Sequence, residues 1–238
     1  MINIYKDIPG KFSPNDGTID FYLRVRTYVN KDTYVLDLGA GKGDWFESRK
    51  KNKTLFNIQY LKPDIKKIIA ADVDRVVLKN KSTHKNLIIK KKIPVKKNSF
   101  DLIICDWVFE HIENPEPFYN EINRVLKKGG IVCARTPYKY SYLAIISNLL
   151  EGSKIKDFIL KKAQPGRGRY FKSYYKMNTK KTISKIFWNY SNNSFIYTPD
   201  PSYFFNSKIL FYLMNKIHFL LPRFFSGVLY SFLKKNSV

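Results

Sequence analysis

Three glycines at alternate positions, Gly39, Gly41 and Gly43, form the stretch GAGKG directly after the apolar run YVLDL. Glycine has no Cβ, so a loop of this kind lets a ligand lie against bare backbone. The phosphate loop G-x-x-x-x-G-K-[ST] is absent, and the dinucleotide fingerprint G-x-G-x-x-G needs a glycine where Asp44 stands. The spacing G-x-G-x-G therefore indicates a ligand that is bound without either nucleotide motif.

A second group of reactive side chains lies in the stretch CDWVFEHIENP. His111 is the candidate general base of this stretch, and ordering of the turn is the alternative role. Asp106 and Trp107 are the other members suited to chemistry, since Trp107 can either offer its π face to a cation or simply pack. The spacing of Asp106, Glu110 and His111 matches no standard metal cluster, so no metal site is predicted.

The elements that must position these residues follow from the apolar pattern. Continuous apolar runs are typical of parallel strands covered on both faces, and the chain has five of them, at 34–41, 67–74, 86–94, 100–107 and 130–137. Helical spacing predicts helices over 18–29 and 114–130. In the second helix Asn114 suits the cap, Pro115 the first turn and Gly129 the end. The alternation of strand and helix predicts a parallel, doubly wound α/β sheet.

Four motifs then stand in a fixed order: VLDLGAGKGDW, IIAADVD, FDLIICDWVFEHIENP and EINRVLKKGGIVCARTP. Together they resemble the class I S-adenosylmethionine-dependent methyltransferases, and the type 11 branch in particular, over about residues 35–137. The resemblance implies a Rossmann-like, doubly wound, mostly parallel seven-stranded sheet with helices on both faces. We expect residues 1–205 to form this domain and residues 206–238 to form an apolar helical C-terminal extension.

The resemblance also implies S-adenosylmethionine as the cofactor. Asp72 would accept hydrogen bonds from the two ribose hydroxyls, and Val73 would pack on the adenine. Asp37 would support the loop or bind the methionine amino group, with capping of loop amides as the alternative. The other predicted cofactor contacts are Gly39, Ala40, Gly41, Gly43, Asp106 and Trp107. Methyl transfer gains most from aligning the methyl donor with the acceptor, so a catalytic base is often not needed. Asp106 and His111 are therefore only candidate catalytic residues.

Two departures from the family pattern stand out. The third apolar run continues as IIKKKIPV, without the acidic residue that often receives the adenine amine. The segment 44–66 is longer than a single helix, which predicts a surface excursion of unassigned role. A separate observation concerns the substrate: the N-P-P-Y type tetrapeptide of amino-directed DNA and protein methyltransferases is absent, and CDWV stands after the fourth apolar run. This weakens the case for a nucleic-acid or peptide-amide substrate.

The net charge of +24 favours an anionic partner, but only 9 of the 43 basic residues are arginine, the preferred residue for bidentate phosphate contacts. A coding bias toward lysine is the simpler interpretation. The sequence therefore predicts methyl transfer to a small-molecule or lipid-linked acceptor. An RNA methyltransferase and a non-catalytic S-adenosylmethionine-binding protein remain the alternatives.

The N-terminus MINIYKDIPGKF has no signal-peptide core, and Cys105 and Cys133 lie in apolar runs, where free thiols are usually buried. We therefore expect a cytoplasmic protein with reduced cysteines. The segment 206–236 is rich in Phe, Leu and Tyr, and Pro222 is expected to divide it into two amphipathic helices. These helices would form a lid over the sheet or rest on an anionic membrane, at its inner face.

Overall fold

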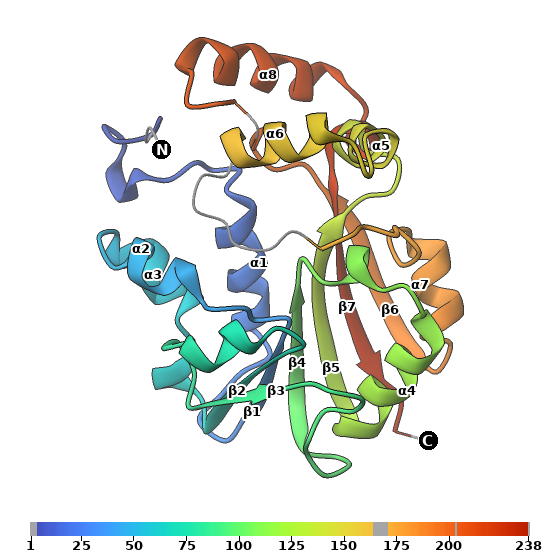
Figure 1. Ribbon diagram of the computed structural model, residues 1–238. Coiled ribbons are helices and arrows are strands. Elements are labelled where there is room, and N and C mark those ends of the chain that lie inside the picture. Colours follow the sequence, from blue (N-terminus) through green and yellow to red (C-terminus); the bar gives the residue numbers. More distant parts are fainter. Residues whose placement is uncertain (1–3, 164–170, 203, 238) are drawn as a thin grey trace.

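A single seven-stranded sheet organises the chain (Figure 1). The computed structural model describes residues 4–163, 171–202 and 204–237. The strand order is β3-β2-β1-β4-β5-β7-β6. The strands are β1 (Tyr34–Leu38), β2 (Lys67–Asp72), β3 (Lys85–Ile88), β4 (Phe100–Asp106), β5 (Leu126–Pro137), β6 (Tyr190–Tyr197) and β7 (Val228–Lys235). β1 to β5 pair in parallel, whereas β7 runs antiparallel to both β5 and β6. The predicted mostly parallel, doubly wound sheet is confirmed.

Helices cover both faces of this sheet and also lie beyond one of its ends (Figure 1). They are α1 (Gly17–Arg26), α2 (Asp44–Arg49), α3 (Lys53–Gln59), α4 (Pro115–Val125), α5 (Tyr142–Leu149), α6 (Lys154–Ala163), α7 (Lys180–Ile186), α8 (Lys208–Leu220) and α9 (Arg223–Ser226). Short 3₁₀ turns lie at Pro9–Lys11, Lys62–Asp64, Arg75–Lys79 and Phe109–His111.

The core is divided by the sheet into two layers. On one face Ile122 and Val125 of α4 and Ile183 of α7 pack against one set of strand side chains. On the other face Phe21 and Val25 of α1 pack against the alternate set. Because successive strand residues point to opposite faces, a continuous apolar run such as that of β4 feeds both layers. Figure 1 shows α1 to α3 on one side of the sheet and α4 and α7 on the other.

The C-terminal segment differs from the prediction. α8 lies where the first tail helix was expected, but residues 228–235 form β7 instead of a second helix. β7 lies between β5 and β6, and its residues from Val228 to Leu233 are buried. A strand in the middle of a sheet is apolar on both faces, and its run cannot be told from a buried helix by periodicity. The expected extension is therefore helical only as far as Ser226, and β7 belongs to the main sheet.

The helix expected over 114–130 is also shorter than predicted. α4 begins after Asn114, with Pro115 in its first turn, and ends at Val125. Leu126 already pairs with Phe100 of β4, and the register then shifts so that Leu102 faces Ile131. The residues between, including Gly129 with φ +72°, form a bulge in β5 and not a helix C-terminus.

The excursion predicted over 44–66 consists of α2, α3 and a 3₁₀ turn. Arg26 at the end of α1 holds it in place. Its guanidinium donates to the backbone oxygens of Asn57, Ile58 (2.7 Å) and Tyr60 (3.0 Å) and pairs with Asp64 at 2.9 Å. One side chain thus fixes the excursion on the face of the sheet that α1 covers.

Candidate functional site

The predicted site residues meet at the carboxyl edge of the parallel strands. The glycine loop follows β1, Asp72 ends β2 and Asp106 ends β4. The three carboxylates of Asp37, Asp72 and Asp106 lie near enough to influence one another electrostatically. In open parallel sheets this edge, where neighbouring strands leave in opposite directions, is the usual place for a ligand.

The glycine loop needs its glycines for two different reasons. Gly39, Gly41 and Gly43 have φ of +71°, +52° and +70°, in the left-handed region that favours glycine. A Cβ on Gly39 would lie 2.5 Å from Val108, and one on Gly43 would lie 2.6 Å from Asn80, so the protein itself fills these two spaces. A Cβ on Gly41 would meet nothing within 4 Å. Gly41 is therefore the loop glycine that faces open space.

Asp72 joins this loop to the end of β2. Its Oδ2 accepts from the Gly41 amide at 2.9 Å, and its Oδ1 accepts from the Asp74 amide at 2.8 Å. Each carboxylate oxygen can accept a further hydrogen bond, so Asp72 can fix the loop and still bind two hydroxyls. Val73, which follows it, is 61% exposed. Asp74 caps the following turn, because its side chain accepts from the Val76 amide at 3.0 Å.

Asp37 is a carboxylate for which the described part of the chain provides no hydrogen-bond donor. Burial, followed by the negative charges of Asp106 and Asp72, raises the pKa of Asp37 from 3.8 to about 7. A carboxylate that capped loop amides would instead have a lowered pKa, since those bonds stabilise its charged form. With its raised pKa and no donor among the described residues, Asp37 is suited to bind a cationic group.

This pKa makes a prediction about stability. The folded protein holds the Asp37 proton up to about pH 7, whereas the unfolded chain loses it near 3.8, so the contribution of Asp37 to stability declines as pH rises between these values. Asp37→Asn should leave the free energy of unfolding unchanged at pH 4 and increase it by about 1–4 kcal/mol at pH 8. Urea denaturation at both pH values measures this. Asp44→Asn, at an exposed position, is the control, and a pH-independent difference for Asp37→Asn would contradict the assignment.

Asp106 forms a buried ion pair that the sequence did not reveal. Its two oxygens accept from Nε and Nη2 of Arg135 at 2.7 and 2.8 Å, and Arg135 also donates to Thr18 at 3.1 Å. Burial opposes the charge on Arg135, but the nearby Asp106 raises the pKa of the guanidinium above its usual range. Asp106 is thus engaged as the partner of Arg135. A charged residue inside the apolar run GIVCARTP was the signal that could have pointed to this pair.

Trp107 follows directly and takes the left-handed conformation, with φ +60°. Its ring lies 5.1 Å from the Arg135 guanidinium, while Phe21 lies at 5.2 Å from the same group. The cation that Trp107 contacts is therefore the Arg135 guanidinium of the same chain. Non-glycine residues in this conformation are uncommon and gather at functional sites, which is consistent with the position of Trp107 at the end of β4.

His111 lies in the turn between β4 and α4 and contacts a distant segment. Its Nδ1 is 2.9 Å from the Lys172 carbonyl oxygen, which only accepts, so Nδ1 carries the proton. Its Nε2 is 3.9 Å from Oε1 of buried Glu110. The backbone oxygen of Glu110 accepts from the amides of Tyr174 and Tyr175. His111 and Glu110 together hold the segment after residue 170 against the turn.

We therefore expect His111 to order this turn. His111→Ala should lower the free energy of unfolding by about 1–2 kcal/mol through the lost hydrogen bond, and should lower turnover by less than about tenfold. Thermal denaturation and initial rates on the same preparation provide the measurement. A loss of turnover of roughly 10²–10⁴ with unchanged cofactor affinity would identify His111 as a general base instead.

The two cysteines, Cys105 and Cys133, are free and fully buried. Burial raises the pKa of both thiols, so neither is suited to act as a nucleophile. Within the described ranges no group of three or more His, Cys, Asp or Glu side chains could hold a metal ion.

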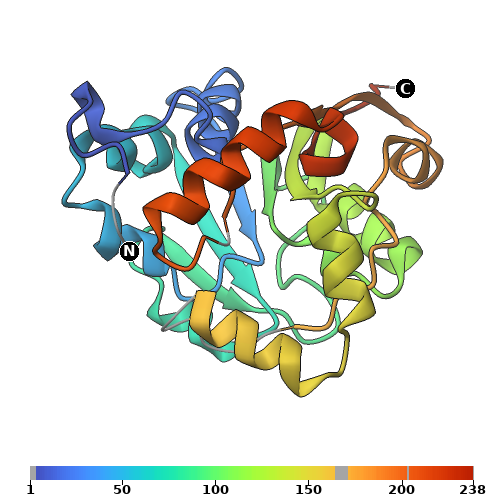
Figure 2. The same ribbon diagram turned by 90° about the horizontal axis from the view of Figure 1, so that it is seen from above.

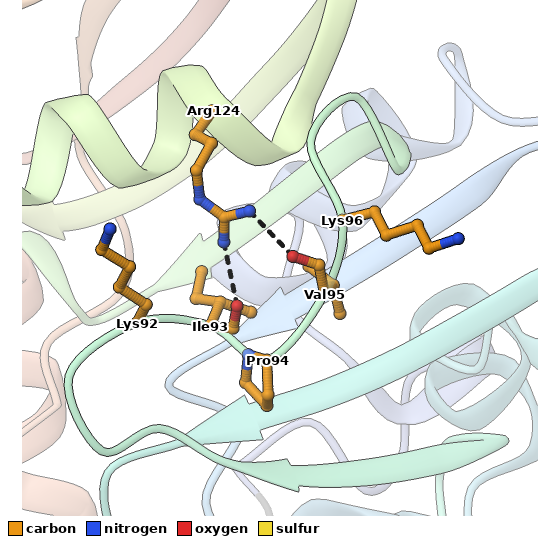
Figure 3. Close-up of a pocket in the computed structure, with 6 residues that line it drawn as sticks. All are labelled: Lys92, Ile93, Pro94, Val95, Lys96 and Arg124. Carbon is orange, nitrogen blue, oxygen red and sulfur yellow. Dashed lines mark hydrogen bonds between the residues drawn. The ribbon is translucent and has the colours of Figure 1, made fainter.

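A hollow elsewhere on the surface has a structural role, because its arginine holds a loop in place. It is lined by Lys92, Ile93, Pro94, Val95, Lys96 and Arg124 (Figure 3). Arg124 donates to the backbone oxygens of Ile93 (2.9 Å) and Val95 (2.8 Å) and pairs with Glu121, so its guanidinium is occupied in fixing the loop before β4. This loop leads into the amino end of β4, at the edge opposite the glycine loop. The hollow is therefore separate from the candidate site.

Comparisons with known proteins agree with this geometry. Residues 36–134 match the family model described as a methyltransferase domain. An uncharacterized protein of Methanocaldococcus jannaschii is 35% identical over 109 residues, which are 45% of this chain and 43% of that protein. This chain therefore spans less than half the length of that relative.

Solved structures are similar over nearly the whole chain. The YcgJ protein of Bacillus subtilis aligns with a TM-score of 0.54 and 13% identity, over 92% of this chain and 98% of that one. An S-adenosylmethionine-dependent methyltransferase of Archaeoglobus fulgidus aligns with a TM-score of 0.52 and 14% identity, over 91% and 92%. At these identities the likeness concerns the fold.

Proposed function

We propose that this chain, a class I S-adenosylmethionine-dependent methyltransferase by its family match over residues 36–134, transfers the methyl group of S-adenosylmethionine to a lipid-linked acceptor, one of the two acceptor classes (small-molecule or lipid-linked) that the sequence predicts. The observation that carries the cofactor site is the link between Asp72 and Gly41. It fixes a left-handed glycine that faces open space beside a carboxylate able to bind two hydroxyls.

Each residue at this edge suits a different part of the cofactor. Asp72 would bind the ribose hydroxyls, and the exposed Val73 would pack on the adenine. Asp37, which lacks a donor among the described residues, would bind the methionine amino group, whose positive charge favours the ionised carboxylate. The sulfonium of the bound cofactor supplies an activated methyl group, and this chain supplies alignment.

The acceptor is inferred from what surrounds the edge. α5, α6 and α8 lie at the end of the molecule where the parallel strands finish (Figure 1). These helices expose large apolar side chains, among them Leu149, Phe158 and Phe219, alongside lysines. An apolar approach to a methyl-transfer site favours an acceptor with an apolar tail. The basic surface keeps RNA as the second candidate, because +24 is an unusually large charge for the chain.

Transfer of a labelled methyl group decides between these acceptors. The purified full chain is incubated with methyl-labelled S-adenosylmethionine and either a total lipid extract or total RNA, and the label is followed into each fraction. We expect label in the organic phase and none in RNA. Label in RNA alone would overturn the lipid-linked acceptor, and the absence of label in both with intact cofactor binding would favour a water-soluble acceptor.

A further inference from the structure

Three helices expose many apolar side chains at one end of the molecule. We call this set the lid surface, and its members are Ile145, Ile146, Leu149, Ile155, Phe158, Ile209, Tyr212, Leu213, Ile217, Phe219 and Leu220. They belong to α5, α6 and α8. Seen from above, α8 crosses the molecule while α5 and α6 lie along its neighbouring sides (Figure 2). Exposed apolar surface on this scale marks an interaction site.

α8 has one face on the protein and one face away from it. Phe211 and His218, seven residues apart, are buried, and His218 bonds to the Tyr142 hydroxyl (2.7 Å) and the Pro199 oxygen (3.2 Å). Ile209 and Leu220 lie on the opposite face and are 83% and 81% exposed, and Phe219 at its side is 91% exposed. α8 is therefore anchored by one stripe and presents a second apolar stripe to the outside.

The charges on this part of the chain are mostly positive. α8 contains no acidic residue and exposes Lys208 and Lys216. Lys216 lies on the outer face itself, seven residues from Ile209 and four from Leu220. The residues 152–238 include 16 lysines and arginines but two acidic residues, Asp157 and Asp200. A surface that is both apolar and basic is complementary to the boundary of an anionic bilayer, where acyl chains accept the side chains and headgroups accept the lysines.

A second copy of the chain fits this surface less well. A two-fold interface would bring Lys208 and Lys216 of one copy against the same region of the other, and like charges across an interface oppose association. None of the helices in the described ranges is long and apolar enough to cross a bilayer. The contact that remains is peripheral.

We propose that the lid surface docks on an anionic phospholipid membrane, with the outer stripe of α8 in the interface and its lysines at the headgroups. This assigns the contact to α5, α6 and α8, rather than to the whole of 206–236, since β7 is buried in the sheet. The lipid-linked acceptor of the proposed function would then meet the site from the membrane. Docking itself requires no methyl transfer and can fail or succeed independently.

Vesicle flotation of the full chain tests the docking. The vesicles contain three parts phosphatidylcholine to one part phosphatidylglycerol, or phosphatidylcholine alone. We expect the wild type to float with the anionic vesicles at low salt and to be released by high salt. The triple variant Ile209→Gln, Phe219→Gln and Leu220→Gln should partition at least about tenfold more weakly, because each side chain would bury apolar area in the interface.

The matched control is Trp188→Gln. Trp188 is 74% exposed and precedes β6 at the opposite edge of the sheet, so its replacement should leave flotation unchanged. Equal flotation of the triple variant and the wild type would contradict docking through the lid surface. So would a wild type that ignores vesicles but forms a dimer that the triple variant loses, since a second copy would then cover the surface. Calorimetry with S-adenosylmethionine on the same proteins tests the proposed function separately from docking. The proposed function would fail if the wild type did not bind S-adenosylmethionine, whatever the outcome of flotation.

Discussion

Asp72→Ala is expected to weaken the binding of S-adenosylmethionine by roughly 30- to 1000-fold. The variant loses two charge-assisted hydrogen bonds to the ribose, at about 2–4 kcal/mol together. It also releases the Gly41 amide that Asp72 holds at 2.9 Å, so the loop loses its support on β2. Isothermal titration calorimetry gives the dissociation constants directly.

Asp74→Ala is the matched control for this variant. Asp74 is also acidic and lies two residues further on, but its side chain caps the Arg75–Lys79 turn through the Val76 amide. Its replacement should change cofactor affinity by less than about threefold, because that bond lies outside the cofactor contacts. Unchanged binding in a folded Asp72→Ala variant would remove Asp72 from the site.

The second large effect concerns the buried pair of Arg135 and Asp106. Arg135→Leu should lower the free energy of unfolding by about 3–5 kcal/mol, because it leaves the Asp106 carboxylate largely buried without its partner. It also removes the cation between the rings of Trp107 and Phe21. Urea denaturation followed by fluorescence measures the loss.

Two comparisons make this test specific. Arg24→Leu removes an equally bidentate pair with Asp20 at the surface, where the expected loss is below about 1 kcal/mol. The double variant Arg135→Leu with Asp106→Leu should recover at least half of the stability lost, since no unpaired charge then remains buried. If Arg135→Leu and Arg24→Leu destabilised the protein equally, the buried pair would not have the importance assigned to it.

The parts of the fold that were predicted correctly are those encoded by local patterns. The continuous apolar run of β4 and the proline at the start of α4 each identify an element within a few residues. Asn114 occupies the position before this helix, but its side chain makes no capping hydrogen bond. The glycine loop, Asp72 and Asp106 could be placed at one edge because the carboxyl ends of parallel strands meet there. These inferences needed no knowledge of distant contacts.

The parts that were missed depend on partners far along the chain. β7 is a strand because residues 228–235 insert between β5 and β6, about a hundred residues from the former, and its apolar run alone is equally compatible with a helix. The role of Arg135 depends on Asp106 across the sheet, and the early end of α4 depends on the pairing of Leu126 with Phe100. Sequence periodicity contains none of these pairings.

The raised pKa of Asp37 could not be predicted from the sequence, because it also depends on residues far apart along the chain. Its cause is burial together with Asp106 and Asp72, which come from two other strands. The sequence suggested two roles for Asp37, at the loop or at the methionine amino group. The lack of a donor among the described residues favours the second, and the pH dependence of stability tests the raised pKa.

Hydrogen exchange with and without S-adenosylmethionine reports both whether the cofactor binds and where it binds. We expect the cofactor to slow exchange in the peptides that contain the loop 39–43, the turn 72–76 and the stretch 106–111, and to leave the loop 92–96 unchanged. Protection confined to residues outside these three segments, or none at concentrations that saturate related enzymes, would contradict a cofactor site at the carboxyl edge of this sheet.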